Sequence, residues 1–144
     1  PHIFTPPPVD VKTDTRLGEI ATLVGANLEP GERELTPGTP LTVTLVWRAE
    51  AETHTSYRVF LHLVDSEATL VAQSDAIPAA WTRPTTGWLP GEYIVDAHTL
   101  TVPEGAPAGD YALYAGLYVP EGERLTTLEG FDTVLLTTVT FKGQ

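Results

Sequence analysis

The sequence predicts an all-β domain, an immunoglobulin-like β-sandwich of about eight antiparallel strands. Three observations lead to this fold class. Apolar side chains recur at every second position in several short segments, as expected for strands with one buried face. The breaks between these segments carry proline or glycine, which are typical of turns. The chain has 144 residues, of which 42% are hydrophobic, which is enough for one core.

Residues 1–16 are predicted to form a proline-rich linker or tail, and residues 17–144 the β-sandwich domain. The consecutive prolines Pro6–Pro8 fix φ and cannot donate to a strand ladder, which favours an extended conformation. An alternative is that the alternation over Val9–Val11 adds a strand to a neighbouring copy. Because the chain begins Pro1-His2-Ile3, we expect it to have been processed or cut from a longer one.

Four strands are expected in the first half of the domain. The first alternates towards one face through Ile20, Thr22, Val24, Ala26 and Leu28. The second has the clearest period of two, with an apolar face of Leu41, Val43, Leu45, Trp47 and Ala49. The third, Tyr57–Val64, carries Phe60 on its second face, so we expect both of its faces to be partly covered. A turn at Asp65 leads into Thr69–Ser74 and completes a hairpin.

Four more strands are expected in the second half, namely Tyr93–Val102, Tyr111–Val119, Arg124–Leu128 and Thr133–Phe141. Tyr111 enters its strand directly after the turn at Gly109. Sandwiches place a tyrosine corner at such a position, with the hydroxyl hydrogen-bonded to backbone. We therefore expect Tyr111 to brace the fold.

The composition limits the partners. A formal net charge of -11 creates a field that repels phosphate backbones and anionic lipid headgroups, so nucleic acid is not expected as a partner. We interpret the acidity as a solvated surface, with calcium or a cationic partner as the alternative. The apolar runs are too short to span a bilayer, so we expect contact with a membrane only through a parent chain. The absence of cysteine excludes disulfides and zinc–sulfur sites.

No motif points to catalysis, and we expect a protein that is not an enzyme and uses no cofactor or metal. The four histidines form no His-x-x-x-His pair, and the serines have no adjacent base and no Gly-x-Ser-x-Gly elbow. His62 and His98 could face each other across adjacent strands and bind a metal together with Asp96. We prefer the interpretation that they are hydrogen-bonded histidines on a half-exposed sheet face.

The segment from Asp75 to Glu92 is the main candidate for a ligand site. It is longer than an ordinary hairpin loop, and long ordered loops often carry binding residues. Indole rings stack on the apolar faces of sugars, while carboxylates and guanidinium groups hydrogen-bond their hydroxyls. Trp81, Arg83, Trp88 and Asp75 are therefore predicted to contact a glycan.

A structural interpretation of the same residues remains open. We favour Trp88 as a plug over one open end of the sandwich, with Arg83 pairing with Asp75 or Asp96 to pin the loop. For Trp81, a plug and an exposed platform are both compatible with the sequence.

Several segments together resemble a known family. These segments are Leu41–Ala49, Tyr57–Leu63, Gln73–Asp75, Pro84–Glu92, Gly109–Tyr111 and Gly116–Tyr118. Over roughly Leu17 to Leu125, the pattern resembles an extracytoplasmic β-sandwich domain. That domain is appended to bacterial membrane proteins of the glycosyltransferase 39, or dolichyl-phosphate-mannose mannosyltransferase-like, class and to related surface proteins. The resemblance implies an extracytoplasmic location, at the cell surface or secreted, and it carries over no catalytic residues.

We therefore predict a non-catalytic, extracytoplasmic accessory or binding module that contacts cell-envelope glycan through the Trp81–Trp88 loop. The alternative is a structural subunit of a surface filament or layer, assembled by self-association through residues 1–16. The position of that tail distinguishes the two hypotheses.

Overall fold

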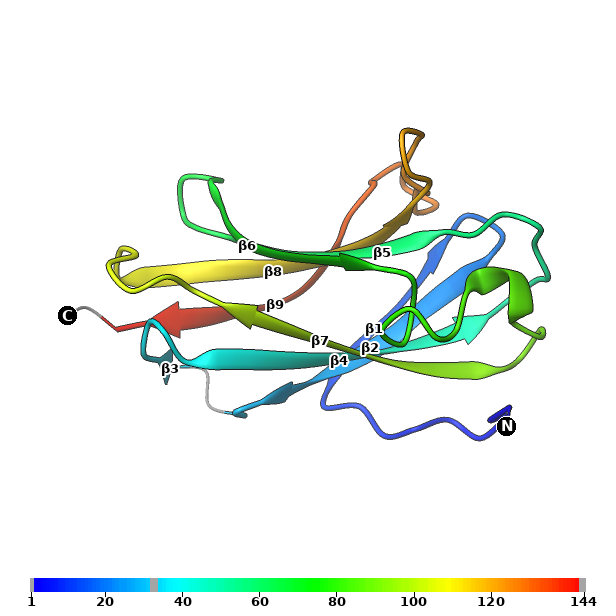
Figure 1. Ribbon diagram of the computed structural model, residues 1–144, viewed down its shortest axis with the longest axis horizontal. Helices are drawn as coiled ribbons and strands as arrows, with labels where there is room; N and C mark the ends of the chain where they lie inside the picture. The colour runs from blue at the N-terminus through cyan, green and yellow to red at the C-terminus, as the bar shows by residue number, and fades with distance from the viewer. Residues whose placement is uncertain (1, 32–33, 143–144) are drawn as a thin grey trace.

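The computed structural model describes residues 2–31 and 34–142, and it shows two β-sheets packed face to face (Figure 1). The elements are β1 (Val11–Leu17), β2 (Ala21–Glu29), β3 (Glu34–Leu35), β4 (Pro40–Ala49), β5 (Arg58–Val64), β6 (Leu70–Ala76), the 3-10 turn η1 (Thr85–Gly87), β7 (Tyr93–Thr101), β8 (Gly109–Tyr118) and β9 (Val134–Phe141). The predicted immunoglobulin-like β-sandwich is confirmed.

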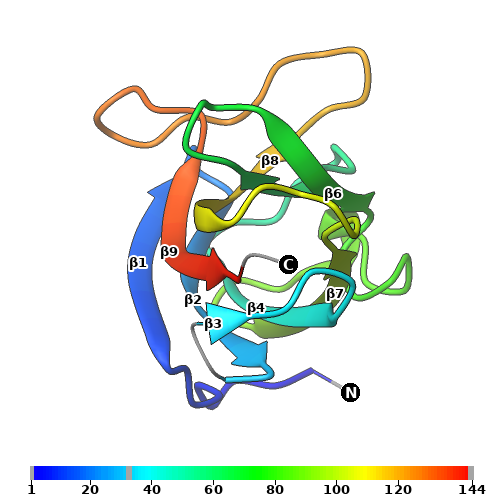
Figure 2. The ribbon, with the colours of Figure 1, turned by 90° about the vertical axis from the view of Figure 1, so that its left-hand side faces the viewer.

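The four-stranded sheet has the order β1-β2-β4-β7, and the five-stranded sheet has the order β3-β9-β8-β5-β6. A view along the strands shows the two sheets facing each other across the core, with β1 of one sheet lying beside β9 of the other at one side (Figure 2). Neighbouring strands are antiparallel except for β3 and β9, which pair in parallel. The hairpin of β5 and β6 is present as expected.

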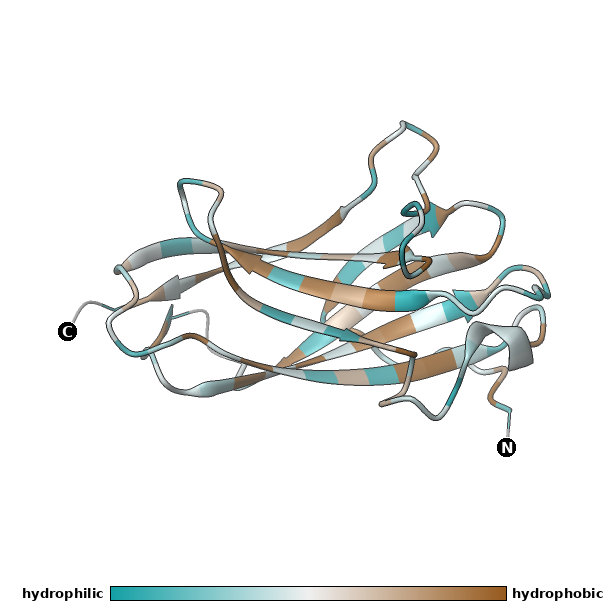
Figure 3. Cartoon of the chain, turned by 45° about the horizontal axis from the view of Figure 1, so that its top comes forward, coloured by the Kyte–Doolittle hydropathy of each residue, from teal (hydrophilic) through white to brown (hydrophobic). Residues whose placement is uncertain are grey.

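The core lies between the two sheets and follows the predicted alternation along most strands (Figure 3). In β4, the fully buried Trp47 belongs to the apolar face that the sequence predicts. Tyr111 is also buried, and its hydroxyl donates a hydrogen bond of 2.6 Å to the carbonyl of Pro107. The predicted tyrosine corner is therefore confirmed.

The N-terminal part of the sandwich differs from expectation. Val11–Leu17 form the edge strand β1, so part of the expected tail belongs to the four-stranded sheet. Polar residues such as Thr13 and Thr15 occupy half-buried positions in this strand, so no apolar alternation marks it in the sequence. Its partner is β2 of the same chain, whereas the alternative prediction places such a strand on a neighbouring copy.

A bulge changes the phase of β2. The register shifts between Leu23 and Gly25, so Ala21 and Leu23 face the core before the bulge, and Ala26 and Leu28 after it. The expected face, which continues one alternation through the whole segment, is therefore wrong for its first half. One extra residue in a strand reverses the direction of every side chain on one side of it.

Two further differences concern short segments. β3 pairs with β9 through only two residues, which is too short for a recognisable period. The expected strand Arg124–Leu128 forms a single bridge, between Tyr118 and Arg124, and otherwise belongs to the irregular segment 119–133.

The tail, residues 2–10, lies along the outside of the four-stranded sheet (Figure 1). The carbonyl of Pro8 accepts a hydrogen bond from Asn27 of β2, and the carbonyl of Ile3 accepts one from the backbone N–H of Tyr93 in β7. The tail is thus docked on its own domain at both ends. Within residues 2–31 and 34–142, no helix is long and apolar enough to cross a bilayer.

Candidate functional site

Phe60 lies on the outer face of the five-stranded sheet, on the strand next to the edge strand β6. The register places it opposite Asp75 of β6 and Gly116 of β8. A Cβ atom at Gly116 would lie only 2.3 Å from the Phe60 ring, so glycine is what lets the ring lie against β8. The guanidinium carbon of Arg124 lies 4.2 Å from the ring centroid, on which it stacks. Although Phe60 points away from the core, it is therefore only 1% exposed.

A hollow of about 200 Å³ opens beside this ring, and we name it the outer hollow. It is lined by Phe60, His62, Asp75, Tyr118, Gly122 and Arg124. The lining combines an apolar ring with an imidazole, a carboxylate, a phenol and a guanidinium group. Such a surface can hydrogen-bond a ligand that presents several hydroxyl groups.

The surroundings set the protonation of two groups in the outer hollow. Burial raises the pKa of the Tyr118 hydroxyl, and the hydrogen bond to Asp75 raises it further, so Tyr118 stays protonated and donates. Burial also lowers the pKa of His62, and the opposing effect of the Asp75 carboxylate is smaller. The imidazole is therefore neutral at neutral pH and offers one donor and one acceptor.

Trp81 lies beside this surface, on the tight turn of residues 77–82 that follows β6. The guanidinium carbon of Arg58 lies 5.1 Å from the centroid of its ring, and the strand register pairs Arg58 with Tyr118 of the outer hollow on β8. Ala79, Ala80 and Trp81 have left-handed φ angles of 57°, 52° and 73°. This conformation costs roughly 1–2 kcal/mol for each residue other than glycine. Trp81 is 54% exposed, so the turn presents its ring to solvent.

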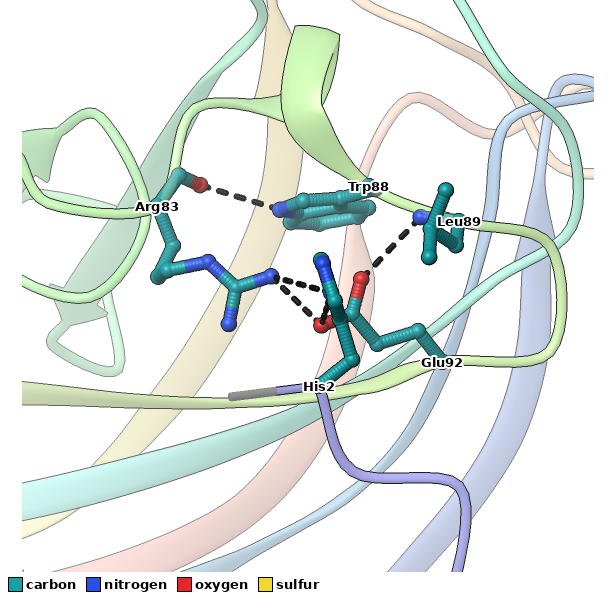
Figure 4. Close-up of polar contacts among 5 residues, drawn as sticks. All are labelled: His2, Arg83, Trp88, Leu89 and Glu92. Carbon is teal, nitrogen blue, oxygen red and sulfur yellow. Dashed lines mark hydrogen bonds and ion pairs between the residues drawn. The ribbon is translucent and has the colours of Figure 1, made fainter.

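The rest of the loop is anchored by a buried carboxylate (Figure 4). Glu92 is 0% exposed and accepts hydrogen bonds from the side chain of Arg83 and the backbone N–H of Leu89. The Nδ1 atom of His2, in the tail, lies 2.6 Å from the same carboxylate. Trp88 is 1% exposed, belongs to the core cluster, and donates from its indole nitrogen to the carbonyl of Arg83. The predicted plug formed by Trp88 is confirmed.

The predicted partners of Arg83 are wrong. Its guanidinium group pairs with Glu92 and not with Asp75 or Asp96. Asp75 is exposed and lines the outer hollow, whereas Asp96 is fully buried between the sheets. Neither carboxylate belongs to the anchor around Trp88.

Glu92 makes stability depend on pH. Burial raises the pKa of its carboxyl, but the hydrogen bonds from Arg83, Leu89 and His2 outweigh burial and hold the pKa below its ordinary value near 4.5. A carboxyl with a lowered folded-state pKa contributes stability above the unfolded-state pKa, and that contribution is lost as the pH falls through the folded-state pKa. We expect the free energy of unfolding, measured with urea, to fall below about pH 4.5.

The variant Glu92→Gln should be less stable than the wild type at pH 7, and the difference between the two should shrink as the pH falls towards 3. Glu129→Gln, a substitution in an exposed loop, serves as the control and should follow the wild type. A constant difference between Glu92→Gln and the wild type across this range would contradict the role given to the carboxylate.

The structure brings together only part of the predicted glycan site. Asp75 lines the outer hollow, and Trp81 is connected to it through Arg58. Arg83 and Trp88 instead belong to the anchor, where the Trp88 ring is enclosed by the core. Within the predicted set, Asp75 and Trp81 are thus the two side chains placed to meet a ligand.

A polar network lies between the sheets on their β6–β7 side. The Oγ atom of Ser74 lies 2.7 Å from Nδ1 of His98, whose Nε2 lies 2.9 Å from the carboxylate of Asp96. That carboxylate also accepts hydrogen bonds from the indole of Trp47 and the backbone N–H of Ala79. The order of groups is that of a hydrolase triad. Because it joins the edge strands of the two sheets and holds the turn 77–82, we interpret it as a brace.

The arrangement of two histidines that the sequence left open does not occur. His62 is on β5 in the five-stranded sheet and lines the outer hollow, whereas His98 is buried on β7 of the four-stranded sheet. The two are therefore not on adjacent strands. Among the described residues, no group of three or more His, Asp or Glu side chains could hold a metal ion.

Phe60, Tyr118 and Arg124 are not indicated as site residues by the sequence, and His62 is indicated only as a possible metal ligand, because the proximity of these side chains depends on strand register. Two signals could have found them. Phe60 is an aromatic residue on the second face of its strand, and Gly116 is a glycine inside a strand, which marks close approach by another group. Together they indicate a ring lying over the outside of the sheet.

Comparisons with known proteins show a shared fold. No family model and no curated protein matches the sequence. Among solved structures, the C-terminal domain of wzt has a TM-score of 0.63 at 13% identity, over 95% of this chain and 83% of that chain. A Niemann-Pick type C2 protein from Japanese carpenter ant has a TM-score of 0.55 at 12% identity, over 92% of this chain and 99% of that chain.

A third solved structure, an alkylpurine DNA glycosylase from Pseudomonas fluorescens, has a TM-score of 0.53 at 11% identity, over 88% of this chain but only 31% of that chain. At such identities the likeness shows the β-sandwich fold alone. It selects neither a ligand nor an activity.

Proposed function

We propose that this chain is a non-catalytic binding module that holds a glycan on the outer face of the five-stranded sheet. The observation that carries the proposal is the outer hollow, where fixed polar groups surround an immobilised aromatic ring. Tyr118, His62 and Asp75 offer donors and acceptors for hydroxyl groups, and Arg124 offers further donors. Sugars present such hydroxyls around an apolar ring face.

The charge of the chain also bears on the class of ligand. The net charge of -11 disfavours nucleic acids and anionic lipid surfaces. In the outer hollow, however, the Arg124 guanidinium and the Asp75 carboxylate are both present. A neutral polyhydroxylated ligand can use both groups, because hydroxyls donate and accept.

The proposal includes a location outside the cytoplasm, which the resemblance to extracytoplasmic domains of bacterial surface proteins supports. In this setting the ligand is a cell-envelope glycan, and any connection to a membrane runs through a parent chain. Self-association through residues 1–16 has less support, since the tail docks on its own domain through Ile3 and Pro8.

A screen of the wild-type protein against immobilised bacterial envelope polysaccharides and a glycan array tests the binding activity. We expect a saturable signal for at least one glycan and none for DNA or anionic vesicles. No glycan binding in either format would contradict the proposal.

The non-catalytic part of the proposal is tested on the brace of Ser74, His98 and Asp96. A fluorophosphonate probe, which labels activated serines, should leave the protein unlabelled. Labelling that disappears in Ser74→Ala would show that the brace is an active triad and would overturn this part.

A further inference from the structure

The turn of residues 77–82 is held in an unfavourable shape by its surroundings. Three successive residues that are not glycine, Ala79, Ala80 and Trp81, all have left-handed φ angles. The backbone N–H of Ala79 donates to the buried Asp96, and the backbone N–H of Trp81 donates to the carbonyl of Ile77 at 2.9 Å. Such backbone strain concentrates at functional sites, where the surrounding structure imposes it.

The strained turn presents the aromatic ring of Trp81 to solvent. Trp81 is 54% exposed, while Trp47 and Trp88 are 0% and 1% exposed. The Arg58 guanidinium lies over the Trp81 ring, with its carbon 5.1 Å from the centroid, which limits the orientations of the indole. An exposed ring that is oriented in this way can serve as a stacking platform.

The exposed Trp81 ring lies next to the outer hollow but is not part of its lining. Arg58 and Phe60 point to the same face of β5, and two residues of a strand span about 7 Å. The Trp81 ring lies against Arg58, and Tyr118, the cross-strand partner of Arg58, lies with its ring centroid 6.2 Å from that of Phe60. A ligand that occupies the outer hollow and also stacks on the Trp81 ring therefore has to extend past Arg58.

We propose that Trp81 forms a second subsite, and that the ligand is an oligosaccharide extending from the outer hollow past Arg58 to the Trp81 ring. This inference rests on the proposed glycan-binding function and adds the class of ligand, a chain of several sugars. Short sugars then occupy the outer hollow alone, and longer ones gain the stacking contact.

A chain-length series tests the inference. Manno-, xylo-, rhamno- and cello-oligosaccharides of one to six units are titrated by calorimetry into the wild type, into Trp81→Ala and into Phe4→Ala. Phe4 is a matched control, since it is 56% exposed but lies in the tail. In the series that binds, we expect the wild-type Kd to fall at least tenfold from the shortest bound sugar to the longest. Trp81→Ala should lose this gain and keep the affinity for the shortest sugar, and Phe4→Ala should retain the gain.

The outcomes separate the two proposals. Equal length dependence in Trp81→Ala and the wild type overturns the second subsite and leaves the glycan-binding function standing. Equal loss of affinity for all lengths in Trp81→Ala also overturns it, because Trp81 would then belong to a single site. Binding by no member of the four series overturns the inference together with the part of the proposed function on which it rests.

Discussion

Replacing Arg124 by alanine is expected to weaken glycan binding by about tenfold to a hundredfold. The substitution removes the donors of the guanidinium group from the outer hollow and uncovers the ring of Phe60. Hydrogen bonds to charged groups contribute roughly 1.5–3 kcal/mol, which corresponds to this range of affinity. The ion pair of Arg124 with Asp132, at 3.5 Å, is partly exposed and contributes little, whereas loss of the stacking on Phe60 should lower the free energy of unfolding by about 1–2 kcal/mol.

Arg16→Ala is the matched control for this substitution. Arg16 lies on β1 in the other sheet and pairs with Glu19 on the surface, so its loss changes the net charge equally without touching the outer hollow. Titration of both variants with the same glycan gives the comparison. An equal loss of affinity in the two variants would show that net charge, and not the outer hollow, determines binding.

Replacing Trp88 by alanine is expected to destabilise the fold by about 3–5 kcal/mol, the usual cost of removing a large buried aromatic side chain. Trp88 is enclosed by the core, and its indole nitrogen holds the carbonyl of Arg83. Trp81→Ala in the same loop should change the free energy of unfolding by less than about 1 kcal/mol, since that ring is largely exposed.

Urea unfolding followed by far-ultraviolet circular dichroism measures both variants without relying on tryptophan fluorescence. The expected difference between the two tryptophans, which lie in one loop, comes from the burial of Trp88 and from its hydrogen bond to Arg83. Similar costs for Trp81→Ala and Trp88→Ala would contradict the division of the loop into an anchor and a platform.

The sequence predicts most of the sandwich because long strands with one buried face carry a clear alternation. Trp47 and its neighbours in β4 show this signal, and Tyr111 is identifiable because a turn precedes it directly. β1 is not predicted, because Thr13 and Thr15 occupy its half-buried positions and the strand therefore shows no alternation of apolar residues. The bulge after Leu23 is not predicted either, because nothing in the local sequence pattern marks where the alternation changes phase.

The candidate site is less predictable than the fold. Trp88 is recognisable as a plug from its place in a long loop, whereas for Trp81 the sequence leaves a plug and an exposed platform both open. Asp75 meets Phe60 only because of the pairing between β5 and β6. Arg124 joins them from an irregular segment. Contacts of this kind depend on strand register, and a slip of one residue would move every side chain of a strand to the other face.

The anchor of Glu92 links the tail to the loop that carries Trp81. His2 and Arg83 share this carboxylate, and Leu89 fixes its other oxygen. The loop is therefore attached on both sides of Trp81 in the sequence. The anchor holds the residues that follow Trp81, and Asp96 accepts a hydrogen bond from the backbone N–H of Ala79, which precedes it. Two independent attachments on either side of one exposed ring favour a rigid platform, which reduces the entropy lost on binding.

Mapping backbone amide chemical shifts by nuclear magnetic resonance during titration with the glycan that binds best tests the central claim most directly. The account predicts that the shifts concentrate on β5, β6 and β8 around Phe60, Asp75 and Tyr118, and on the turn that carries Trp81. Shifts that concentrate on the four-stranded sheet or the tail, with the outer hollow unaffected, would contradict it.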